Sequence, residues 1–267
     1  MKNKFKLNSS TLLVFILTTG VFGIINTEMG VIGILPLIAE NFQVTVPEAG
    51  WTVSIFALVV AISAPITPLL FSGINRKKVM ILALGLFTLS NIISMMTTNF
   101  TVLLISRALP AFLHPVYVSM AFTVAAASVS KEKAPKAVAK VFIGVSAGMV
   151  LGVPVTSYIA SEVSYSMGML FFTVVNALVL VATILFVPSM PVKEKLSYGT
   201  QLSVLKKKVV WYSILAITLI NGALFGFFSY MSDYLKTITG VSYTVISTML
   251  LIYGLANIIG NVIAGKQ

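Results

Sequence analysis

The sequence predicts an all-α integral membrane protein that crosses a bilayer about eight times. Hydrophobic residues make up 58% of the 267 residues and charged residues only 9%, whereas roughly a quarter of a soluble domain is charged. The apolar residues form blocks of about 20 residues, the length an α-helix needs to cross about 30 Å of hydrocarbon. The alternating segments of about ten residues that are typical of a membrane β-barrel are not found.

The apolar blocks define eight predicted spans. They cover approximately residues 11–36, 49–72, 78–97, 101–126, 136–160, 167–188, 209–232 and 243–265. The longest connection, residues 189–208, is polar and basic and contains Pro191. We therefore expect a six-helix bundle over residues 1–188, a linker over 189–208, and the first two helices of an incomplete second bundle over 209–267.

Basic residues mark alternate connections between the spans. The clusters are Lys2, Lys4 and Lys6 before the first span, Arg76, Lys77 and Lys78 after the second, Lys131, Lys133 and Lys136 after the fourth, and Lys193, Lys195, Lys206, Lys207 and Lys208 after the sixth. The other loops carry Glu40, Glu48, Glu162, Asp233 and a single lysine, Lys236. The positive-inside rule then predicts a multi-pass protein of the cell membrane with a cytoplasmic N-terminus and a cytoplasmic linker.

The net charge of +11 does not predict a nucleic-acid partner. The basic residues lie in short clusters between apolar blocks and form no continuous stripe, so the charge is explained by membrane topology. The chain has no cysteine and therefore no disulfide or thiol chemistry. We expect the lipid bilayer, a small-molecule substrate and protons as partners, and the sequence predicts no metal site and no particular oligomeric state.

A weak internal repeat appears when the chain is shifted by 197 positions. The pairs at 44–45 and 241–242 then coincide, as do the segments at 55–58 and 252–255. The seventh span therefore restarts the pattern of the first, as in transporters built from repeated bundles. If both repeats are equally long, a whole protein needs about 390 residues, so we expect roughly four further helices beyond this sequence.

Three ionisable residues lie inside predicted spans, where a charge is costly and calls for an explanation. Glu28 suits proton exchange or contact with a cationic substrate, and the alternative is a structural partner for a buried arginine. Arg107 keeps its charge and must face a cavity or a partner, so Glu28 and Arg107 form either a functional pair or a structural ion pair. His114 either relays a proton or is a neutral, hydrogen-bonded imidazole.

Neighbouring polar residues extend this set of candidates. Arg107 and His114 are seven positions apart and therefore share a helix face, and Tyr117 lies near that face. We take Asn26, Tyr117 and Asn221 as candidates for the wall of a substrate cavity. For Asn91, Asn176 and Asn221, hydrogen bonding between helices is the expected role.

The fifth span contains Gly144, Gly148 and Gly152 at intervals of four, followed by Pro154. Small residues at this spacing form one stripe on a helix and let a second helix approach closely. The proline removes one helix hydrogen bond and bends the helix nearby. Ordinary helix packing would explain the stripe, but the combination favours a stiff, closely packed hinge.

These features resemble the major facilitator superfamily, and within it the bacterial drug and sugar efflux antiporters of the drug:proton antiporter or arabinose-efflux type. The matching segments are TEMG at 27–30, GILPLIA at 33–39, AGW at 49–51, FAL at 56–58, AP at 64–65, Arg107, and GVSAGMVLGVP at 144–154, the last being similar to the antiporter motif of the fifth helix. The resemblance covers the whole chain. It implies alternating access between two six-helix bundles, driven by a proton gradient with no bound cofactor.

Two departures from this family matter. The loop after the second span lacks the aspartate of the family's Gly-x-x-x-Asp-Arg motif, although Arg76, Lys77 and Lys78 keep its basic character. Family members have about twelve helices, whereas eight are predicted here.

Two functions remain open on the sequence. The first is proton-coupled efflux of a small organic solute, such as a drug, a sugar, a nucleoside or a purine. The second is a non-transporting, truncated chain that needs a missing C-terminal part. A membrane enzyme is disfavoured because one histidine, no cysteine and seven acids provide little material for a catalytic constellation. A channel is disfavoured because no filter-like loop is found.

Overall fold

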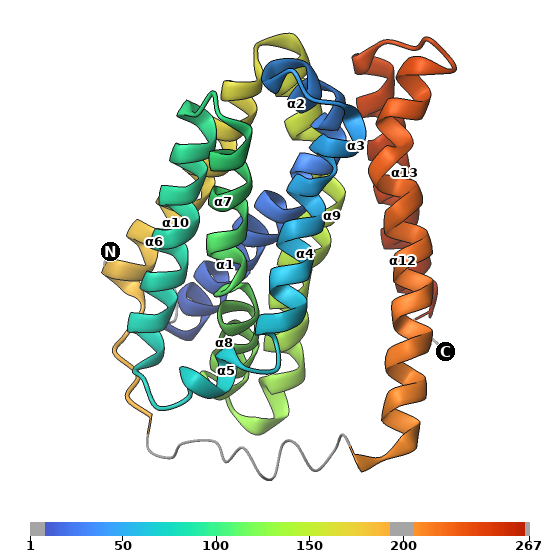
Figure 1. Cartoon of the computed structure of the whole chain (residues 1–267). Helices are drawn as coiled ribbons and strands as arrows, with labels where there is room; N and C mark the ends of the chain where they lie inside the picture. The colour runs from blue at the N-terminus through green and yellow to red at the C-terminus, as the bar shows by residue number, and fades with distance from the viewer. Residues whose placement is uncertain (1–8, 193–205, 265–267) are drawn as a thin grey trace, which may run out of the picture.

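The computed structural model describes residues 9–192 and 206–264, and every regular element in these ranges is helical (Figure 1). The elements are α1 (Ser9–Met29), η1 (Gly30–Ile34), α2 (Leu35–Phe42), α3 (Val46–Ala49), α4 (Trp51–Ser63), α5 (Thr67–Leu70), α6 (Arg76–Met96), α7 (Phe100–Ala111), α8 (His114–Ala127), η2 (Lys131–Lys133), α9 (Ala134–Glu162), α10 (Tyr165–Phe186), α12 (Lys208–Thr237) and α13 (Tyr243–Ala264).

The prediction of an all-α membrane protein is confirmed. Within the described residues, seven helical stretches are long and apolar enough to cross a membrane. The eighth predicted span corresponds to α13, which has 22 residues and is apolar over Tyr243–Ala256.

The predicted linker falls mostly on residues 193–205, which include Lys193 and Lys195 and lie outside the described residues. Lys2, Lys4 and Lys6 also lie outside them. The boundary between the two bundles therefore stays a prediction.

Three of the predicted spans contain breaks in the regular α-helix. The first changes from α-helix to 3-10 helix at Gly30 and returns to α-helix at Leu35, directly before Pro36. The second ends its long helix at Ser63 and resumes as α5, because Pro65 cannot donate the hydrogen bond that would continue the helix. Such breaks are not visible in hydropathy, which measures how apolar a segment is and not its local backbone geometry.

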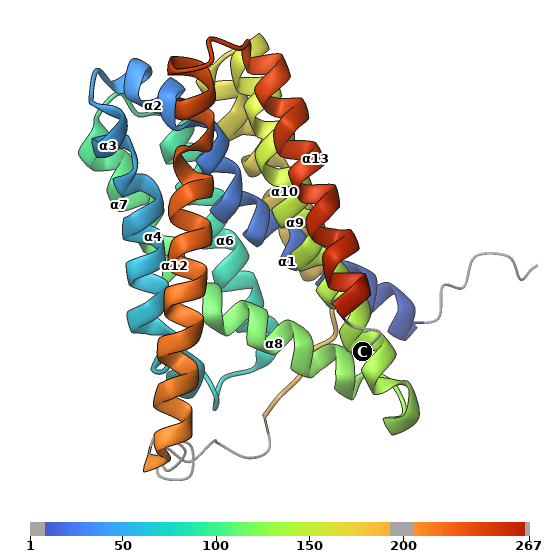
Figure 2. The ribbon, with the colours of Figure 1, turned by 90° about the vertical axis from the view of Figure 1, so that its right-hand side faces the viewer.

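The fourth span is divided into α7 and α8 around Leu113. Pro110 lies inside the last turn of α7 and Pro115 in the first turn of α8, and each proline removes a backbone donor. Figure 2 shows that α8 then crosses one half of the bundle instead of continuing along its length. His114 is consequently the first residue of a helix and not the middle of one.

The first span forms the centre of the six-helix body. It packs against α8, α9 and α10. In the most apolar 18-residue stretch of this span, 72% is buried inside the molecule. Fully buried side chains at this centre include Leu17, Ile24 and Tyr117. This central position places Glu28 among the other helices of the body.

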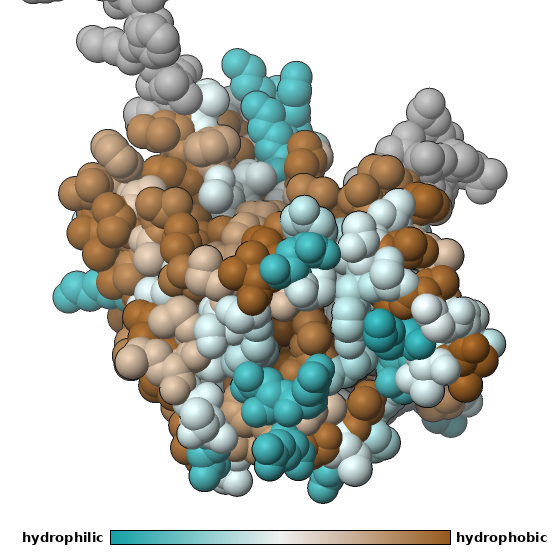
Figure 3. Space-filling view, turned by 90° about the horizontal axis from the view of Figure 1, so that it is seen from above, coloured by the Kyte–Doolittle hydropathy of each residue, from teal (hydrophilic) through white to brown (hydrophobic). Residues whose placement is uncertain are grey.

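The two ends of the molecule differ in charge. The basic end is the one that carries Arg76, Lys77 and Lys78 of α6 and Lys131 and Lys133 of η2. The acidic end is the one that carries Glu40, Glu48, Glu162 and Asp233. Figure 3 looks onto the acidic end, where hydrophilic patches are exposed between hydrophobic ones.

Helices α12 and α13 lie beside the six-helix body and join each other through a turn at Gly240, whose φ of 68° suits a residue without a side chain (Figures 1 and 2). Helix α13 packs along α9. Helix α12 reaches the body near the acidic end, where Phe228 packs with Ile32 of η1 and Val153 of α9. Toward the basic end α12 is exposed, as Tyr212 at 70% illustrates.

Candidate functional site

Arg107 of α7 holds the break between α1 and η1. Its Nη1 donates to the carbonyl oxygen of Thr27 at 2.7 Å and its Nη2 to the carbonyl oxygen of Glu28 at 3.2 Å. Its Nε donates to the carbonyl of Thr52 on α4 at 3.3 Å. The last carbonyls of a helix lack intrahelical partners and carry partial negative charge. Arg107, of which only 3% is exposed, therefore satisfies the end of α1 and ties it to α4 and α7.

Glu28 pairs with His114 and not with Arg107. The His114 Nε2 lies 3.1 Å from the Glu28 Oε2, and the two side chains are 12% and 18% exposed. Neither ring nitrogen of His114 has an aligned hydrogen-bond partner among the described residues, so this approach is a close polar contact and not a well-oriented hydrogen bond. The expected Glu28–Arg107 ion pair is absent from the described structure, because Arg107 binds the backbone of Glu28 instead of its carboxylate.

Phe56 of α4 contacts both Arg107 and His114. Its ring lies 5.0 Å below the Arg107 guanidinium carbon and packs edge to face with His114 at 5.8 Å between centroids. A further ring, Phe87 of α6, lies 6.3 Å from Phe56. An aromatic face attracts a desolvated cation. Phe56 therefore stabilises Arg107 from one side and fixes the position of the histidine from the other.

Thr27 is the hydrogen-bonding hub beside this pair. Its hydroxyl donates to the Gly23 carbonyl at 2.9 Å and accepts from the amides of Asn91 on α6 at 3.3 Å and Asn176 on α10 at 2.8 Å. All three polar side chains are at most 3% exposed. The structure thus gives Asn91 and Asn176 the interhelical hydrogen bonds that we expected of them.

The glycine stripe of α9 faces α1. A methyl group at Gly144 would collide with the carbonyl oxygen of Thr18, and one at Gly148 would lie 2.8 Å from Ile25. A methyl group at Gly152 would lie 2.8 Å from the Asn26 Oδ1. The stripe thus allows backbone-to-backbone contact between these two helices. Helix α9 runs without interruption through Pro154, which is buried.

The remaining cavity candidates do not join the Glu28 cluster. Asn26 is fully buried on the side of α1 that faces α9, and its amide has no hydrogen-bond partner among the described residues. Tyr117 is also fully buried, with its ring beside Gly20. Asn221 is exposed on α12 and donates to Ile217 of its own helix at 2.9 Å. The expected interhelical bond of Asn221 is therefore not present in the described structure, because this part of α12 stands apart from the body.

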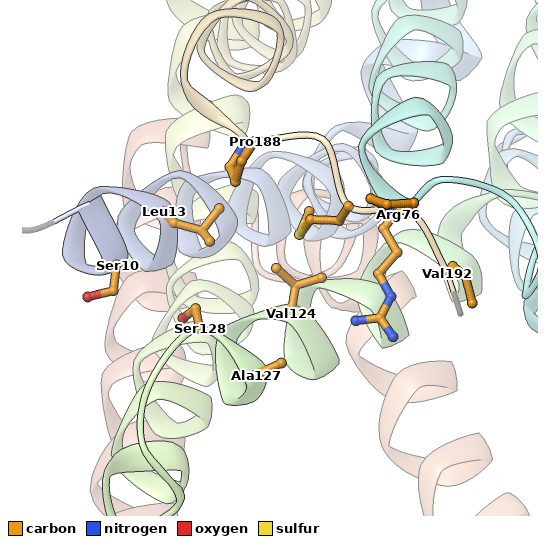
Figure 4. A pocket seen from close by; sticks show the side chains of 10 residues that line it. Ser10, Leu13, Arg76, Val124, Ala127, Ser128, Pro188 and Val192 are labelled. Atoms are coloured by element: carbon orange, nitrogen blue, oxygen red, sulfur yellow. The ribbon is translucent and has the colours of Figure 1, made fainter. Parts of the chain in front are cut away.

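The basic residues after the second span occupy the first turn of α6. Lys77 donates from Nζ to the carbonyl of Ile184 in α10 at 2.9 Å. A cavity of about 740 Å³ opens beside Arg76 (Figure 4), and none of the residues that line it belongs to the Glu28 cluster. Within the described residues, no group of three or more acidic or histidine side chains could hold a metal ion.

The arrangement brings together a carboxylate, an imidazole and a fixed guanidinium at two broken helices. Discontinuous helices at membrane depth are a recurring feature of transporter binding sites, since they free backbone groups for ligands. The Glu28 carboxylate and the His114 imidazole bind no backbone group of the described residues, whereas Arg107 is committed to backbone carbonyls. Sequence reasoning missed the roles of Thr27 and Phe56, although both lie in segments that it had singled out. A neutral hydroxyl and a phenyl ring at membrane depth gave no signal comparable to a charge.

Known proteins match most of the chain. Residues 12–266 match the Major Facilitator Superfamily. The inner membrane transport protein YdhP of Escherichia coli is 30% identical over 250 residues, which cover 94% of this chain and 64% of that protein. The uncharacterised MFS-type transporter YtbD of Bacillus subtilis is 32% identical over 256 residues and is covered to 63%. The chain therefore spans a little under two thirds of these relatives.

Solved structures agree on the fold. A bacterial homologue of the human lysosomal transporter Spinster, in an inward-facing and unoccupied conformation, gives a TM-score of 0.73 at 16% identity over 94% of this chain and 60% of that one. The human organic anion transporter MFSD10 gives 0.65 at 16% identity, covering 92% of this chain and 70% of the other. Together with the sequence match, this helical architecture shows that the chain is a multi-pass membrane protein of the major facilitator superfamily, a family of transporters and not of enzymes.

Proposed function

We propose that this chain mediates proton-coupled efflux of a small organic solute by alternating access, as a member of the drug and sugar efflux group. The observation that carries the proposal is the Glu28–His114 contact of 3.1 Å between two broken helices at the centre of the body. A proton on Glu28 would cancel its attraction for His114, and loss of that proton would restore it. Solute binding and proton binding could then exclude each other at one carboxylate.

The positions of α12 and α13 support an inward-open state. Helix α13 packs along α9, whereas α12 meets the six-helix body near the acidic end, where Ser232 is fully buried, and is exposed toward the basic end. The basic end would face the cytoplasm of the cell under the positive-inside rule. Rocking of the second part against the first would then expose the Glu28 region alternately to the two sides.

The test is proton release from proteoliposomes that hold a pH-sensitive dye under an imposed pH gradient. The solutes to be added are a pentose, a nucleoside and a lipophilic cation, one for each class of solute that the sequence leaves open. For a solute that evokes proton movement, Glu28→Gln should abolish it, since the amide cannot exchange a proton. The matched control is Glu162→Gln, an exposed acid at the acidic end, which should transport normally. Unchanged solute-evoked proton movement in Glu28→Gln would refute the proposed coupling of solute export to protons at this residue.

A second candidate is a chain that transports only together with further helices. None of the most apolar window of α12 is buried, and the chain covers 64% of YdhP. Helices that supply the missing contacts would bury α12 and close the second half of the cavity wall. On this view, the isolated chain binds no solute but regains transport when the last third of YtbD is fused to it.

The same fusion allows a structural measurement, because the chain has no cysteine of its own. Gly222→Cys on α12 should react readily with a lipid-soluble maleimide in the isolated chain, since nothing lies within 4 Å of a side-chain atom placed there. The fusion should slow this labelling. Equal labelling rates, combined with full transport by the isolated chain, would rule out the second candidate.

A further inference from the structure

Three consecutive cations at the start of α6 have different surroundings. Lys77 has a structural partner, because its Nζ donates to a carbonyl in the last turn of α10. The C-terminal end of a helix attracts positive charge. Lys78 is exposed. Arg76 is half-buried, and its guanidinium makes no hydrogen bond or ion pair with any described residue. A half-buried guanidinium keeps its charge and calls for an anion.

The cavity of about 740 Å³ beside Arg76 has the size of a small-molecule site, for which about 300–1,000 Å³ is usual. Its walls come from the start of α1, the end of α8 and the segment after α10. They include the apolar side chains of Leu13, Val124 and Met190 and the hydroxyl of Ser128. No acidic residue lines it within the described part of the chain. Figure 4 shows Arg76 extending toward α8, which carries Val124.

The segment after α10 is fixed at this cavity by hydrogen bonds to the cap of α6. The Asn75 Nδ2 donates to the Ser189 Oγ at 2.7 Å, the Met190 amide donates to the Asn75 Oδ1 at 3.3 Å, and the Arg76 amide donates to the Met190 carbonyl at 3.1 Å. The wall that leads into the predicted linker is thus preformed. It holds the cavity open next to the guanidinium.

We propose that this cavity binds the phosphate headgroup of an anionic phospholipid. The guanidinium would bind the phosphate through two parallel hydrogen bonds, and the apolar walls would cover the glycerol and the start of an acyl chain. The location favours a lipid over a soluble anion, because Arg76 opens a membrane-length helix and therefore lies where headgroups lie. Anionic lipids are concentrated in the cytoplasmic leaflet, which the basic end faces if the proposed orientation holds.

The experiment uses the full chain in nanodiscs of phosphatidylcholine that contain a minority of spin-labelled phosphatidylglycerol. The fraction of motionally restricted label gives the relative association constant of the anionic lipid. Arg76→Gln should lower this constant by about five-fold or more, the factor that corresponds to roughly 1 kcal/mol per basic residue at a membrane surface. The matched control Lys78→Gln removes the same charge two residues further along α6, outside the cavity, and should change the constant less than about two-fold.

A second variant keeps the test decisive if Arg76→Gln does not fold. Ala127→Leu fills the exposed apolar wall of the cavity while the guanidinium remains, and it should also reduce retention of the spin-labelled lipid. Equal losses in Arg76→Gln and Lys78→Gln would mean diffuse surface attraction and would overturn the proposal, and so would normal retention in Ala127→Leu. In detergent without lipid, binding of inorganic phosphate that phosphatidylglycerol does not displace would assign the cavity to a soluble anion instead. None of these outcomes depends on transport, so the lipid site and the efflux proposal can fail separately.

Discussion

The first span and α12 are equally apolar, yet the first span is largely buried and α12 is exposed. In the first span 72% of the most apolar window is buried, and in α12 none of it is. The internal repeat predicted from the sequence gives both the same position in successive bundles. Hydropathy therefore explains why each helix enters a membrane, but it does not explain why the first becomes the centre of a bundle.

The difference lies in what the small and polar residues of each helix meet. Glycines at the contact between α1 and α9 leave no room for a methyl group, whereas Gly222 and Gly226 of α12 have nothing within 4 Å of that position. Thr27 of the first span bonds to two other helices, whereas Asn221 of α12 bonds to its own. In lipid, helix association depends on such close packing and polar contacts, because lipid tails are as apolar as leucine.

The largest effect is expected for Gly144→Val. The added atoms would meet the Thr18 carbonyl, a backbone atom that cannot rotate away, so the free energy of unfolding should fall by about 3 kcal/mol or more. This loss of stability is measured by thermal unfolding in detergent, with the folded fraction at each temperature determined by size-exclusion chromatography. Gly222→Val on α12 is the control and should leave the midpoint almost unchanged. Similar shifts for both would remove the basis of the comparison.

Arg107→Leu should come next. It leaves the carbonyls of Thr27 and Glu28 without their buried donor, and an unsatisfied buried group costs about 1–3 kcal/mol. We expect a lower unfolding midpoint and faster proteolysis at the α1 break, seen by mass spectrometry of the fragments. Lys208→Gln, which removes an exposed charge at the start of α12, should change neither. Intact resistance to proteolysis in Arg107→Leu would show that the break holds without its cap.

Thr27→Val is nearly isosteric and tests the hydroxyl hub alone. The amides of Asn91 and Asn176 lose an acceptor, and we expect a loss of about 1–2 kcal/mol in the free energy of unfolding. Asn221→Ala on α12 breaks a bond within one helix and should cost under about 0.5 kcal/mol. If the two variants unfold at the same temperature, the polar hub does not distinguish the two regions.

The smallest effect is expected at the acidic end, where the second part is linked to the first. Thr244 of α13 donates to the Glu162 Oε1 at 3.1 Å in an exposed position. Thr244→Val should therefore lower stability by less than about 0.5 kcal/mol. A shift comparable to that of Thr27→Val would mean that this exposed contact carries the attachment of α13, and that burial along α9 contributes little.

The sequence located the chemically costly residues but not their partners. Glu28, Arg107 and His114 were singled out because charge at membrane depth is rare, and the structure brings all three into one cluster. Their pairing was not predictable from spacing, because Glu28 lies on a different helix and because the break at Leu113 separates Arg107 in α7 from His114 in α8. The placement of Asn221 was missed for a related reason, since it depends on how far α12 stands from the body.

Sequence by itself determined that this chain is helical, apolar enough to span a membrane about eight times, and asymmetric in its charged loops, because these properties follow from composition and length. Tertiary structure alone decided that Arg107 caps a broken helix, that Glu28 faces His114, and that α1 is central while α12 is exposed. The physical reason is that carbonyl caps, ion pairs and glycine contacts join residues that are far apart in the chain, and their energies depend on distances that no local pattern encodes.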